Sequence, residues 1–460
     1  MGQGGSASAS LATKPTRGEE LRRVLGIQDM ILLIVGTVIG SGIFLVPGVV
    51  LQDVGNSIPW AMSVWLVGGF LSLLGALTYG ELSAMNPQAG GLYIYIRDCF
   101  GPLPAFLFGW TLFFVVSTGS TATLAVAFSA YLKEFVPLSI VTGKAISILL
   151  IAIIVAVNVR GTRQSADLQN WTTGIKVFAI LAMATGLLWF GRSLSSPAVL
   201  DLTPHSGRSL MAGLGLAIIS VLWAYEGWQY ATFAAGETLN PQRTFPLAFL
   251  LGSGALIVIY LYANIGYVAA LGPGGVASSN RVAAEAITAV INPTMARLAT
   301  VAILVSMFSA ANSILLTASR VYYAMARDGL FFQKLAEVHP RFGTPALAVI
   351  SGGAWAGILA VTGTFEQLLT YVIFVGWSFY ALAAASVFVY RRRAPEMPRP
   401  YRVPGYPWTP LIFIIAVSAM VANVIVSQPA RAALGFGIVL TGVPAYAIWR
   451  KRGIEIKKSL

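Results

Sequence analysis

Gly40, Ser41 and Gly42 interrupt a long apolar run near its middle, and no other feature of the sequence has clearer chemical potential. Glycine is the weakest ordinary helix former, so two glycines around a serine favour a break in the helix. In hydrocarbon, an unwound backbone is tolerated only where it is buried in protein or lines a cavity. The break frees N–H groups for a carboxylate and carbonyl groups for an ammonium. The sequence therefore predicts a pocket for a small zwitterion.

A second interruption lies at Glu226 and Gly227, near the middle of the apolar run 219–233. It follows the first interruption by five apolar runs, which predicts two repeats of five helices. Because five is odd, the repeats have opposite topologies, an arrangement that permits alternating access to a central site. Glycines that only let helices pack closely are the alternative explanation. The matching positions of the two interruptions favour a binding site.

Lys176 is a charged residue deep within the apolar run 166–190. It is about ten residues from the inner end of its helix, hence roughly 15 Å deep. An unpaired ammonium at that depth is costly. Two interpretations stay open: the side chain extends back to the inner interface, or its ammonium bridges neighbouring helices as a fixed cation. The depth favours the fixed cation.

Composition assigns the whole chain to the membrane. Hydrophobic residues make up 57% and charged residues 10% of the 460 residues, with a mean hydropathy of +0.76. About a quarter of the residues in soluble domains are charged. The single cysteine, Cys99, excludes an internal disulfide, and with only two histidines we predict no metal site and no cofactor. A membrane-embedded enzyme would need clustered His, Cys or carboxylate residues, so we predict that the protein is not an enzyme.

The elements that must position these residues are apolar runs of about twenty residues, each long enough to cross a bilayer as a helix. We predict twelve: 28–51, 57–85, 101–132, 138–159, 166–190, 211–236, 246–271, 286–326, 346–363, 366–390, 408–427 and 431–449. The predicted fold class is an all-α membrane protein with twelve transmembrane helices, of which helices 1 and 6 are broken. The first repeat covers 28–190, the inverted repeat 211–390, and two extra helices 408–449.

The positive charges predict the orientation of the chain. An even number of helices places both termini on one side, and a cytoplasmic location gives the inner segments most of the Lys and Arg residues. The outer segments then hold only Lys133, Lys144, Arg192, Arg208, Arg281, Arg297 and Arg431. The positive-inside rule requires this asymmetry. We therefore predict a multi-pass protein of the plasma or inner membrane, with cytoplasmic tails over 1–27 and 450–460 and no cleaved signal peptide.

Several motifs resemble one transporter superfamily. Gly40-Ser41-Gly42-Ile43-Phe44 resembles the first-helix motif of the amino acid–polyamine–organocation superfamily, and Tyr79 to Tyr93 resembles its pattern from helix 2 into the next loop. Three further blocks resemble its L-type amino acid transporter branch, namely Trp223–Trp228, Ser319–Gly329 and Arg399–Pro404. The motifs occur in order from residue 36 to about 410, so the resemblance covers nearly all of the membrane domain.

The resemblance implies a set of substrate-binding residues. In similar transporters the substrate carboxylate meets backbone N–H groups and a hydroxyl of the broken first helix, here Ser41, Gly42 and Ile43. The substrate ammonium meets carbonyls that end the first half-helices, here around Val38, Ile39, Trp223 and Glu226.

Two of these residues need separate comment. Trp223 occupies the position of the aromatic residue that closes over substrate from outside, and an interfacial or packing tryptophan is the alternative. Glu226 departs from the glycine of animal relatives. Its carboxyl group reaches the ammonium or a cationic substrate, or it is protonated or paired elsewhere.

The resemblance also bears on coupling. Sodium-coupled members of this architecture hold a cation between helices 1, 5 and 8, and sodium-independent relatives place a lysine there, at the position of Lys176. Tyr260 aligns with a tyrosine that works with this lysine in relatives, with ordinary core packing as the alternative.

The predicted function is secondary active transport of L-amino acids, as sodium-independent exchange of neutral amino acids by alternating access. Proton-coupled uptake and a cationic amino acid or polyamine carrier are the alternatives that Glu226 leaves open. A channel is less favoured, because both halves contain a broken helix and no filter is visible. Animal members of the branch bond to a glycoprotein through a cysteine between helices 3 and 4. The corresponding loop here has none, so we predict no disulfide-linked partner, and the only partners expected are the amino acid and the bilayer.

Overall fold

Helices make up the regular structure of the residues that the structure describes. The computed structural model describes residues 21–195, 209–279, 281–363, 365–427 and 429–459; most of the predicted N-terminal tail and Arg208 lie outside these ranges. Within them there is no strand, only an isolated bridge between Leu25 and Thr238. Nine described helices are long and apolar enough to span a membrane, or ten if the bent pair α1 and α2 is one span. The predicted all-α membrane class is confirmed.

The helices follow one another through the chain with short connections. The first part contains α1 (Ile27–Val38), α2 (Gly42–Asp53), α3 (Ile58–Met85), α4 (Leu92–Phe100), α5 (Pro102–Thr111), η1 (Leu112–Val116), α6 (Ser117–Leu132), α7 (Ile140–Arg160), α8 (Thr162–Phe190) and η2 (Ser193–Ser195). The second contains α9 (Leu210–Ala224), η4 (Trp228–Glu237), α10 (Pro241–Ser278), α11 (Val282–Val290), α12 (Pro293–Arg327), η5 (Gln333–Ala336), α13 (Ala346–Thr362), α14 (Phe365–Arg393), α15 (Trp408–Ser427) and α16 (Pro429–Ser459).

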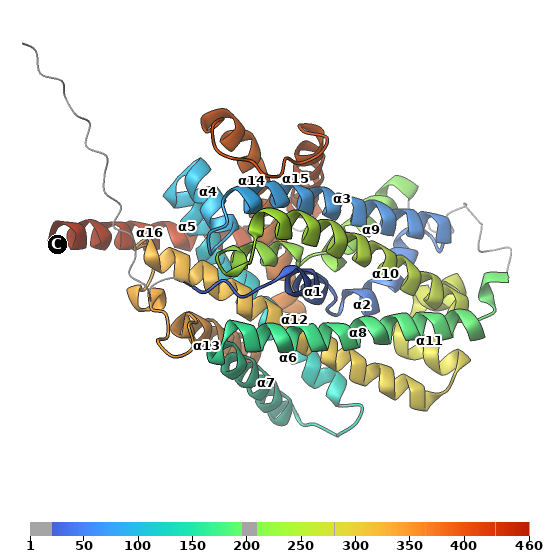
Figure 1. Cartoon of the computed structure of the whole chain (residues 1–460). Coiled ribbons are helices and arrows are strands. Elements are labelled where there is room, and N and C mark those ends of the chain that lie inside the picture. The colour runs from blue at the N-terminus through green and yellow to red at the C-terminus, as the bar shows by residue number, and fades with distance from the viewer. Residues whose placement is uncertain (1–20, 196–208, 280, 364, 428, 460) are drawn as a thin grey trace, which may run out of the picture.

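The long helices run side by side along one direction, and the short helices α1 and α2 lie in the middle of them (Figure 1). The first half-helix α1 packs against α8, α10 and α12, and α2 packs against α9 and α10. The two interrupted segments are therefore enclosed by continuous helices, the environment in which unwound backbone is tolerated in a membrane.

Two parts of the fold differ from the prediction. The single run predicted over 286–326 is two helices, because the Asn292 side chain accepts the Met295 N–H at 2.9 Å and Pro293 begins α12. Asn at the N-cap and Pro at the first position are helix-start signals. In addition, the segment after helix 2 that we read as a loop contains the short helix α4.

The third predicted run contains an irregular turn. Leu112–Val116 forms a π-helix between α5 and α6, and the Ser117 and Thr118 hydroxyls donate to carbonyls five residues earlier, those of Leu112 and Phe113. Such π segments are rare and often occur at functional sites. This one lies directly before the part of α6 that lines the central cavity described below.

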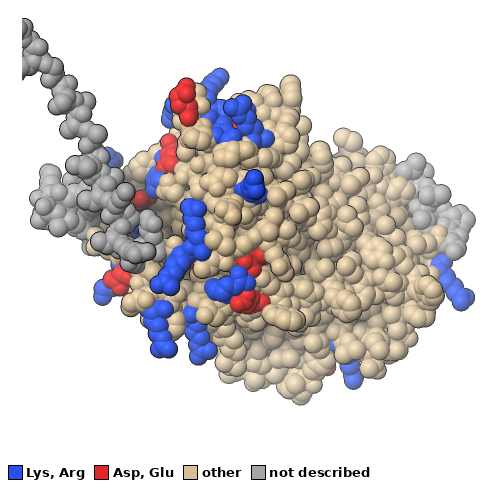
Figure 2. Space-filling model, viewed as in Figure 1, with Lys and Arg blue, Asp and Glu red and all other residues tan. Residues whose placement is uncertain are grey.

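Charge is distributed unevenly over the surface. Figure 2 shows that Lys and Arg side chains gather toward the end of the molecule at which α4 lies, and that only scattered ones are visible toward the other end. The surface between carries exposed apolar residues such as Trp171, Phe178 and Val258, as expected for side chains that face lipid.

Candidate functional site

The first break separates α1 from α2, which are bent by 49°. The Ile39 N–H still donates to the Val35 carbonyl at 3.0 Å, as in a helix, but the Gly40 N–H donates to the Val38 carbonyl at 2.8 Å. The next turn begins with a bond from the Phe44 N–H to the Ser41 carbonyl at 3.1 Å. The N–H groups of Gly42 and Ile43 precede that bond and so stand at the open N-terminal end of α2. This end of α2 carries the positive partial charge of the helix.

The second break separates α9 from the 3₁₀ helix η4, at residues 225–227. Gly227 has φ +130°, a conformation that residues with a Cβ rarely adopt. Its N–H donates to Oε1 of Gln229 at 3.0 Å, and the Glu226 N–H donates to the Trp223 carbonyl at 3.1 Å. The predicted interruption of the sixth helix is thus present at the predicted residues.

The two breaks pack directly against each other. A Cβ atom added to Gly42 would lie 3.0 Å from Cα and Cβ of Ala224, and one added to Gly227 would lie 3.0 Å from the Thr37 backbone. Gly42 therefore allows the first break to pack against α9, and Gly227 allows the second break to pack against α1. The glycines of both segments serve this approach as well as the unwinding.

A cavity of about 90 Å³ lies where the breaks meet. Its walls come from α1, α6, α9, α12 and both breaks, through Thr37, Val38, Gly40, Ser41, Gly42, Ser120, Thr123, Leu124, Trp223, Ala224, Glu226, Gly227, Tyr230, Ala310 and Ile314. The lining includes five of the predicted site residues, Val38, Ser41, Gly42, Trp223 and Glu226. The predicted residues Ile39 and Ile43 are buried and do not line it.

Four hydroxyl groups in the lining were missed by sequence reasoning: those of Thr37, Ser120, Thr123 and Tyr230, of which the Thr37 hydroxyl donates to a carbonyl of its own helix. The Thr123 and Tyr230 hydroxyls are buried and make no hydrogen bond of normal geometry within the described chain. Buried polar groups in proteins are nearly always paired, so these two are free to meet a polar ligand. The run of Ser and Thr over 117–123, unusual within an apolar span, was the available signal.

Glu226 is the only charged side chain among the described residues that line the cavity. Its Oε1 accepts a hydrogen bond from the Tyr380 hydroxyl at 2.9 Å and one from Nε2 of Gln229 at 3.4 Å. Gln229 also holds the Gly227 N–H, so the carboxyl group is linked to the second break. Trp223 lies beside it and is half-buried.

Lys176 is buried and reaches the first break. Its side chain is 1% exposed, and Nζ donates to the carbonyls of Gly36 at 2.5 Å and Ile39 at 2.8 Å. The Ser306 hydroxyl of α12 donates to the same Ile39 carbonyl at 2.9 Å. Among the ion pairs of the described residues none includes Lys176. The ammonium therefore faces the carbonyl end of α1, the negative end of that half-helix.

Tyr260 lies between the ends of α1 and α9, the helices that precede the two breaks. Its hydroxyl lies 3.1 Å from the Val38 carbonyl and 3.0 Å from the Ala224 carbonyl, and with one proton it donates to one of them at a time. The described contacts give it no bond to Lys176. Both residues instead hold carbonyls at the end of α1, so the link between them is indirect, through the backbone.

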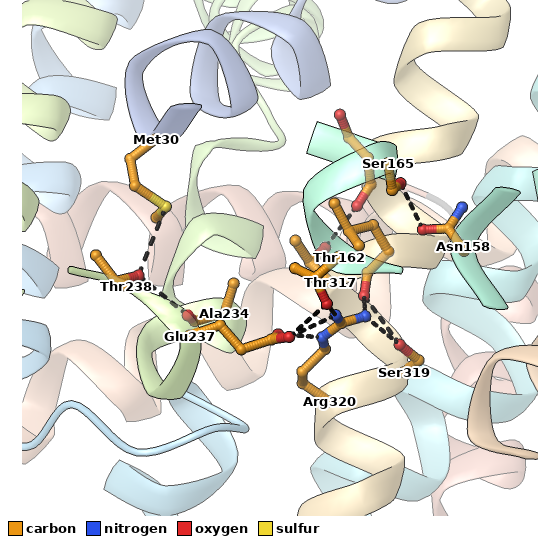
Figure 3. Close-up of polar contacts among 12 residues, drawn as sticks. Met30, Asn158, Thr162, Ser165, Ala234, Glu237, Thr238, Thr317, Ser319 and Arg320 are labelled. Atoms are coloured by element: carbon orange, nitrogen blue, oxygen red, sulfur yellow. Dashed lines mark hydrogen bonds and ion pairs between the residues drawn. The ribbon is translucent and has the colours of Figure 1, made fainter. Parts of the chain in front are cut away.

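A buried ion pair, separate from the cavity lining, lies after the second break. Arg320 of α12 donates from Nε to Oε2 of Glu237 at 2.5 Å and from Nη2 to Oε1 at 2.9 Å, and the Thr162 hydroxyl donates to Oε1 at 2.6 Å (Figure 3). All three side chains are buried. The Glu237 carbonyl also accepts the N–H groups of Val24 and Leu25. This network joins η4, α8, α12 and the segment before α1.

Glu237→Gln is expected to destabilise this network strongly. The substitution leaves the buried Arg320 guanidinium without its counter-charge, and removing one partner of a buried pair typically costs about 3–5 kcal/mol. Thermal unfolding in detergent should shift to lower temperature, and exchange should slow. Glu337→Gln, at an exposed position, is the matched control. Unfolding and transport as in the wild type would show that the pair does not hold these helices together.

Comparison with known proteins places the chain among amino acid carriers. A family model described as "Amino acid permease" matches residues 25–448. The human protein named "Cystine/glutamate transporter" is 32% identical over 463 residues, covering 96% of this chain and 89% of that protein. The "Serine/threonine exchanger SteT" of Bacillus subtilis is 31% identical, covering 95% and 99%. The human "Large neutral amino acids transporter small subunit 2" is 29% identical, covering 97% and 84%.

Proposed function

This chain belongs to the amino acid permease family, and from that membership we propose that it exchanges small neutral L-amino acids across the membrane without sodium. The relatives are transporters rather than enzymes, which confirms the predicted class and the predicted resemblance to L-type transporters. The observation that carries the proposal is the cavity between two broken helices, with a lysine fixed against the first break.

The cavity residues divide between the two ends of an amino acid. The N–H groups of Gly42 and Ile43, with the Ser41 hydroxyl, bind the carboxylate at the positive end of α2. Carbonyls around Val38 and Ile39, and those of Trp223 and Glu226 at the second break, surround the ammonium. The Ile39 carbonyl takes part indirectly, since Lys176 and Ser306 already bond to it. Trp223 covers the bound substrate.

The lining favours a small and neutral substrate side chain. The relatives are named for three different substrate groups, so family membership leaves the choice to the pocket. A volume of about 90 Å³ is small beside the roughly 300–1,000 Å³ of pockets for drug-sized ligands. The Glu226 carboxyl disfavours an anionic side chain, while the Thr123 and Tyr230 hydroxyls suit a polar one. Serine, threonine and alanine fit this description best.

Sodium independence follows from the position of Lys176. A bound sodium ion would be held by backbone carbonyls and hydroxyls, and the ammonium with Ser306 already contacts those carbonyls at the end of α1. A fixed cation removes the need for a mobile one, so inward and outward steps proceed with amino acid alone and the reaction is exchange. Tyr260 supports the same carbonyl end.

The arrangement in the membrane completes the proposal. Counting α13 and α14 with the apolar helices gives twelve spans, with repeats over 28–190 and 211–390 in opposite orientation and two further helices over 408–449. The end rich in Lys and Arg faces the cytoplasm (Figure 2), so both termini are cytoplasmic in the plasma or inner membrane. The chain works without a disulfide-linked partner, since the connection between α6 and α7 has no cysteine and Cys99 is buried.

Counterflow in proteoliposomes tests this function. Vesicles loaded with unlabelled serine should accumulate labelled serine well above empty vesicles, because only a carrier shows stimulation by substrate on the opposite side. Replacement of sodium by choline should leave the rate unchanged. Among common L-amino acids, alanine and threonine should compete and glutamate should not. Uptake without stimulation would indicate a channel, and a sodium requirement would contradict the proposed role of Lys176.

Glu226 favours a second candidate, proton-coupled uptake or transport of cationic amino acids or polyamines. A carboxyl group within a membrane span is costly when ionised and is a functional residue by default. It takes up a proton, or it pairs with a cationic substrate. In either role the carboxyl group would take part in the transport cycle, whereas in a neutral exchanger it would only disfavour anionic substrates.

Glu226→Gln separates the two candidates. The amide keeps an oxygen for the Tyr380 hydroxyl but loses the charge. For a neutral exchanger, we expect the affinity for serine to change by less than about threefold, with new competition from glutamate. The second candidate would be favoured if the affinity for lysine decreased by more than about ten times as much as the affinity for serine. The disappearance of a pH dependence of transport seen in the wild type would also favour it. Competition assays at several pH values give both readouts.

A further inference from the structure

A groove separate from the central cavity runs along the outer surface of α8, beside the start of α1. Its volume is about 930 Å³. Residues of α8 at helical spacing form one wall, among them Trp171, Ile175 and Phe178, and Ile27 and Leu32 of α1 contribute to the other. Trp171 and Phe178 are 75% and 74% exposed, so the described chain does not cover them.

The polar end of the groove has excess negative charge. Both Nη atoms of Arg163 donate to Asp29, at 2.8 and 3.0 Å, Nε donates to Asp167 at 2.9 Å, and further bonds go to Asp167 and the Val24 carbonyl. These contacts engage all five N–H donors of the guanidinium. Two carboxylates thus surround one cation, which leaves one net negative charge, and the Asp167 side chain is 54% exposed.

The same end also offers an unused acceptor. Nδ2 of Asn170 donates to Oδ1 of Asp29 at 2.6 Å. Because a carboxylate only accepts hydrogen bonds, this contact fixes the orientation of the amide. Oδ1 of Asn170 is buried and has no hydrogen-bond partner. The polar end therefore lacks a donor, and an ammonium group supplies both the donor and the positive charge.

The rest of the groove matches an acyl chain. It becomes apolar from Trp171 onward, and Gly174 leaves its floor open, since a Cβ there would meet no atom within 4 Å. From Arg163 to Phe178 the helix rises about 22 Å. One leaflet of a bilayer, headgroups included, is about 20–22 Å thick. Trp171 lies at the change from polar to apolar lining, where tryptophan is typical of the membrane interface.

We propose that this groove binds one phospholipid with a primary ammonium headgroup, of the phosphatidylethanolamine type. The ammonium contacts Asp167 and Oδ1 of Asn170, the indole N–H of Trp171 donates to the phosphate or ester region, and an acyl chain lies over Gly174 toward Phe178. The site rests on the membrane placement of α8 and not on which amino acid is carried. Because α1 forms one wall, a bound lipid also favours one position of α1 against α8.

Native mass spectrometry of the full chain tests the site. The protein is incubated with equal amounts of phosphatidylethanolamine, phosphatidylcholine and phosphatidylglycerol of the same acyl composition. We expect the wild type to retain one phosphatidylethanolamine in preference to the other two. Asp167→Asn removes the net charge and should reduce this preference about two- to fivefold, the range for an exposed ion pair. Gly174→Leu fills the floor and should remove bound lipid of every headgroup.

Gly174→Leu should still fold, because its Cβ meets no atom and leucine is the better helix former. Gly254→Leu on α10, where a Cβ also meets no atom, is the matched control and should retain lipid as the wild type does. Equal retention of the three lipids by the wild type would overturn the proposal. Retention of lipid by Gly174→Leu as in the wild type would also overturn it. The same holds if the wild type forms a dimer without bound lipid and Gly174→Leu dissociates that dimer.

Discussion

Replacing Lys176 with alanine is expected to abolish exchange while leaving protein in the membrane. The substitution removes two charged hydrogen bonds to the Gly36 and Ile39 carbonyls, each of a kind worth about 1.5–3 kcal/mol. These bonds tie α8 to the end of α1, with Ser306 of α12 on the same Ile39 carbonyl. Their loss should shift the equilibrium between the inward-open and outward-open conformations on the order of a hundredfold. Counterflow of labelled serine measures the loss.

Lys144→Ala is the matched control, because Lys144 is exposed near the start of α7. It should exchange serine as the wild type does. Normal counterflow in Lys176→Ala would contradict the proposed role of the lysine, and restored exchange in the presence of sodium would support it, because a mobile cation would then occupy the vacated position. Tyr260→Phe loses only a neutral hydrogen bond to α1 or α9, so a milder defect of the same kind is expected.

The elements of this fold were predictable where a single local signal dominates. Apolar runs of about twenty residues predicted the long helices. Gly40 and Gly42 predicted the break at 39–41, and Glu226 with Gly227 at the matching position predicted the break at 225–227. The division at Asn292 was missed because the run 286–326 is apolar on average, and the helix start depends on only two residues, the N-cap Asn292 and Pro293. Helix α4 was missed because nine residues with Arg97 and Asp98 fall below any criterion for a span.

The lining of the cavity was predictable only in part, because it depends on which faces of distant helices meet. Ser41, Gly42 and Trp223 follow from the breaks and the family motifs, whereas Thr123 reaches the cavity after a π-helical turn that has no local sequence signal. The contacts of Tyr260 show the same limit. The resemblance implied that Tyr260 works with Lys176, but its hydroxyl lies beside backbone carbonyls. Every residue has a backbone carbonyl, so the sequence does not indicate which one is the partner.

Gly42→Val is expected to abolish substrate binding, and it tests the meeting of the two breaks more directly than any other substitution. Even one added carbon would lie 3.0 Å from Ala224, and valine adds two methyl groups on a stiff β-branched side chain. The breaks must separate to admit it. The start of α2 would then move away from the second break, and in the proposed site the carboxylate and the ammonium could no longer be bound together.

Ser41→Ala provides the contrast in a binding assay with labelled serine. It removes one hydroxyl contact without added volume, and the loss of a neutral hydrogen bond of about 0.5–1.5 kcal/mol predicts a decrease in affinity of about two- to tenfold. Gly42→Val should instead bind below detection while it elutes as a single species in gel filtration. Serine methyl ester should fail to compete even with the wild type, since it presents no anion to the end of α2. Wild-type affinity in Gly42→Val would mean that substrate does not bind between the breaks, and the cavity would need another occupant.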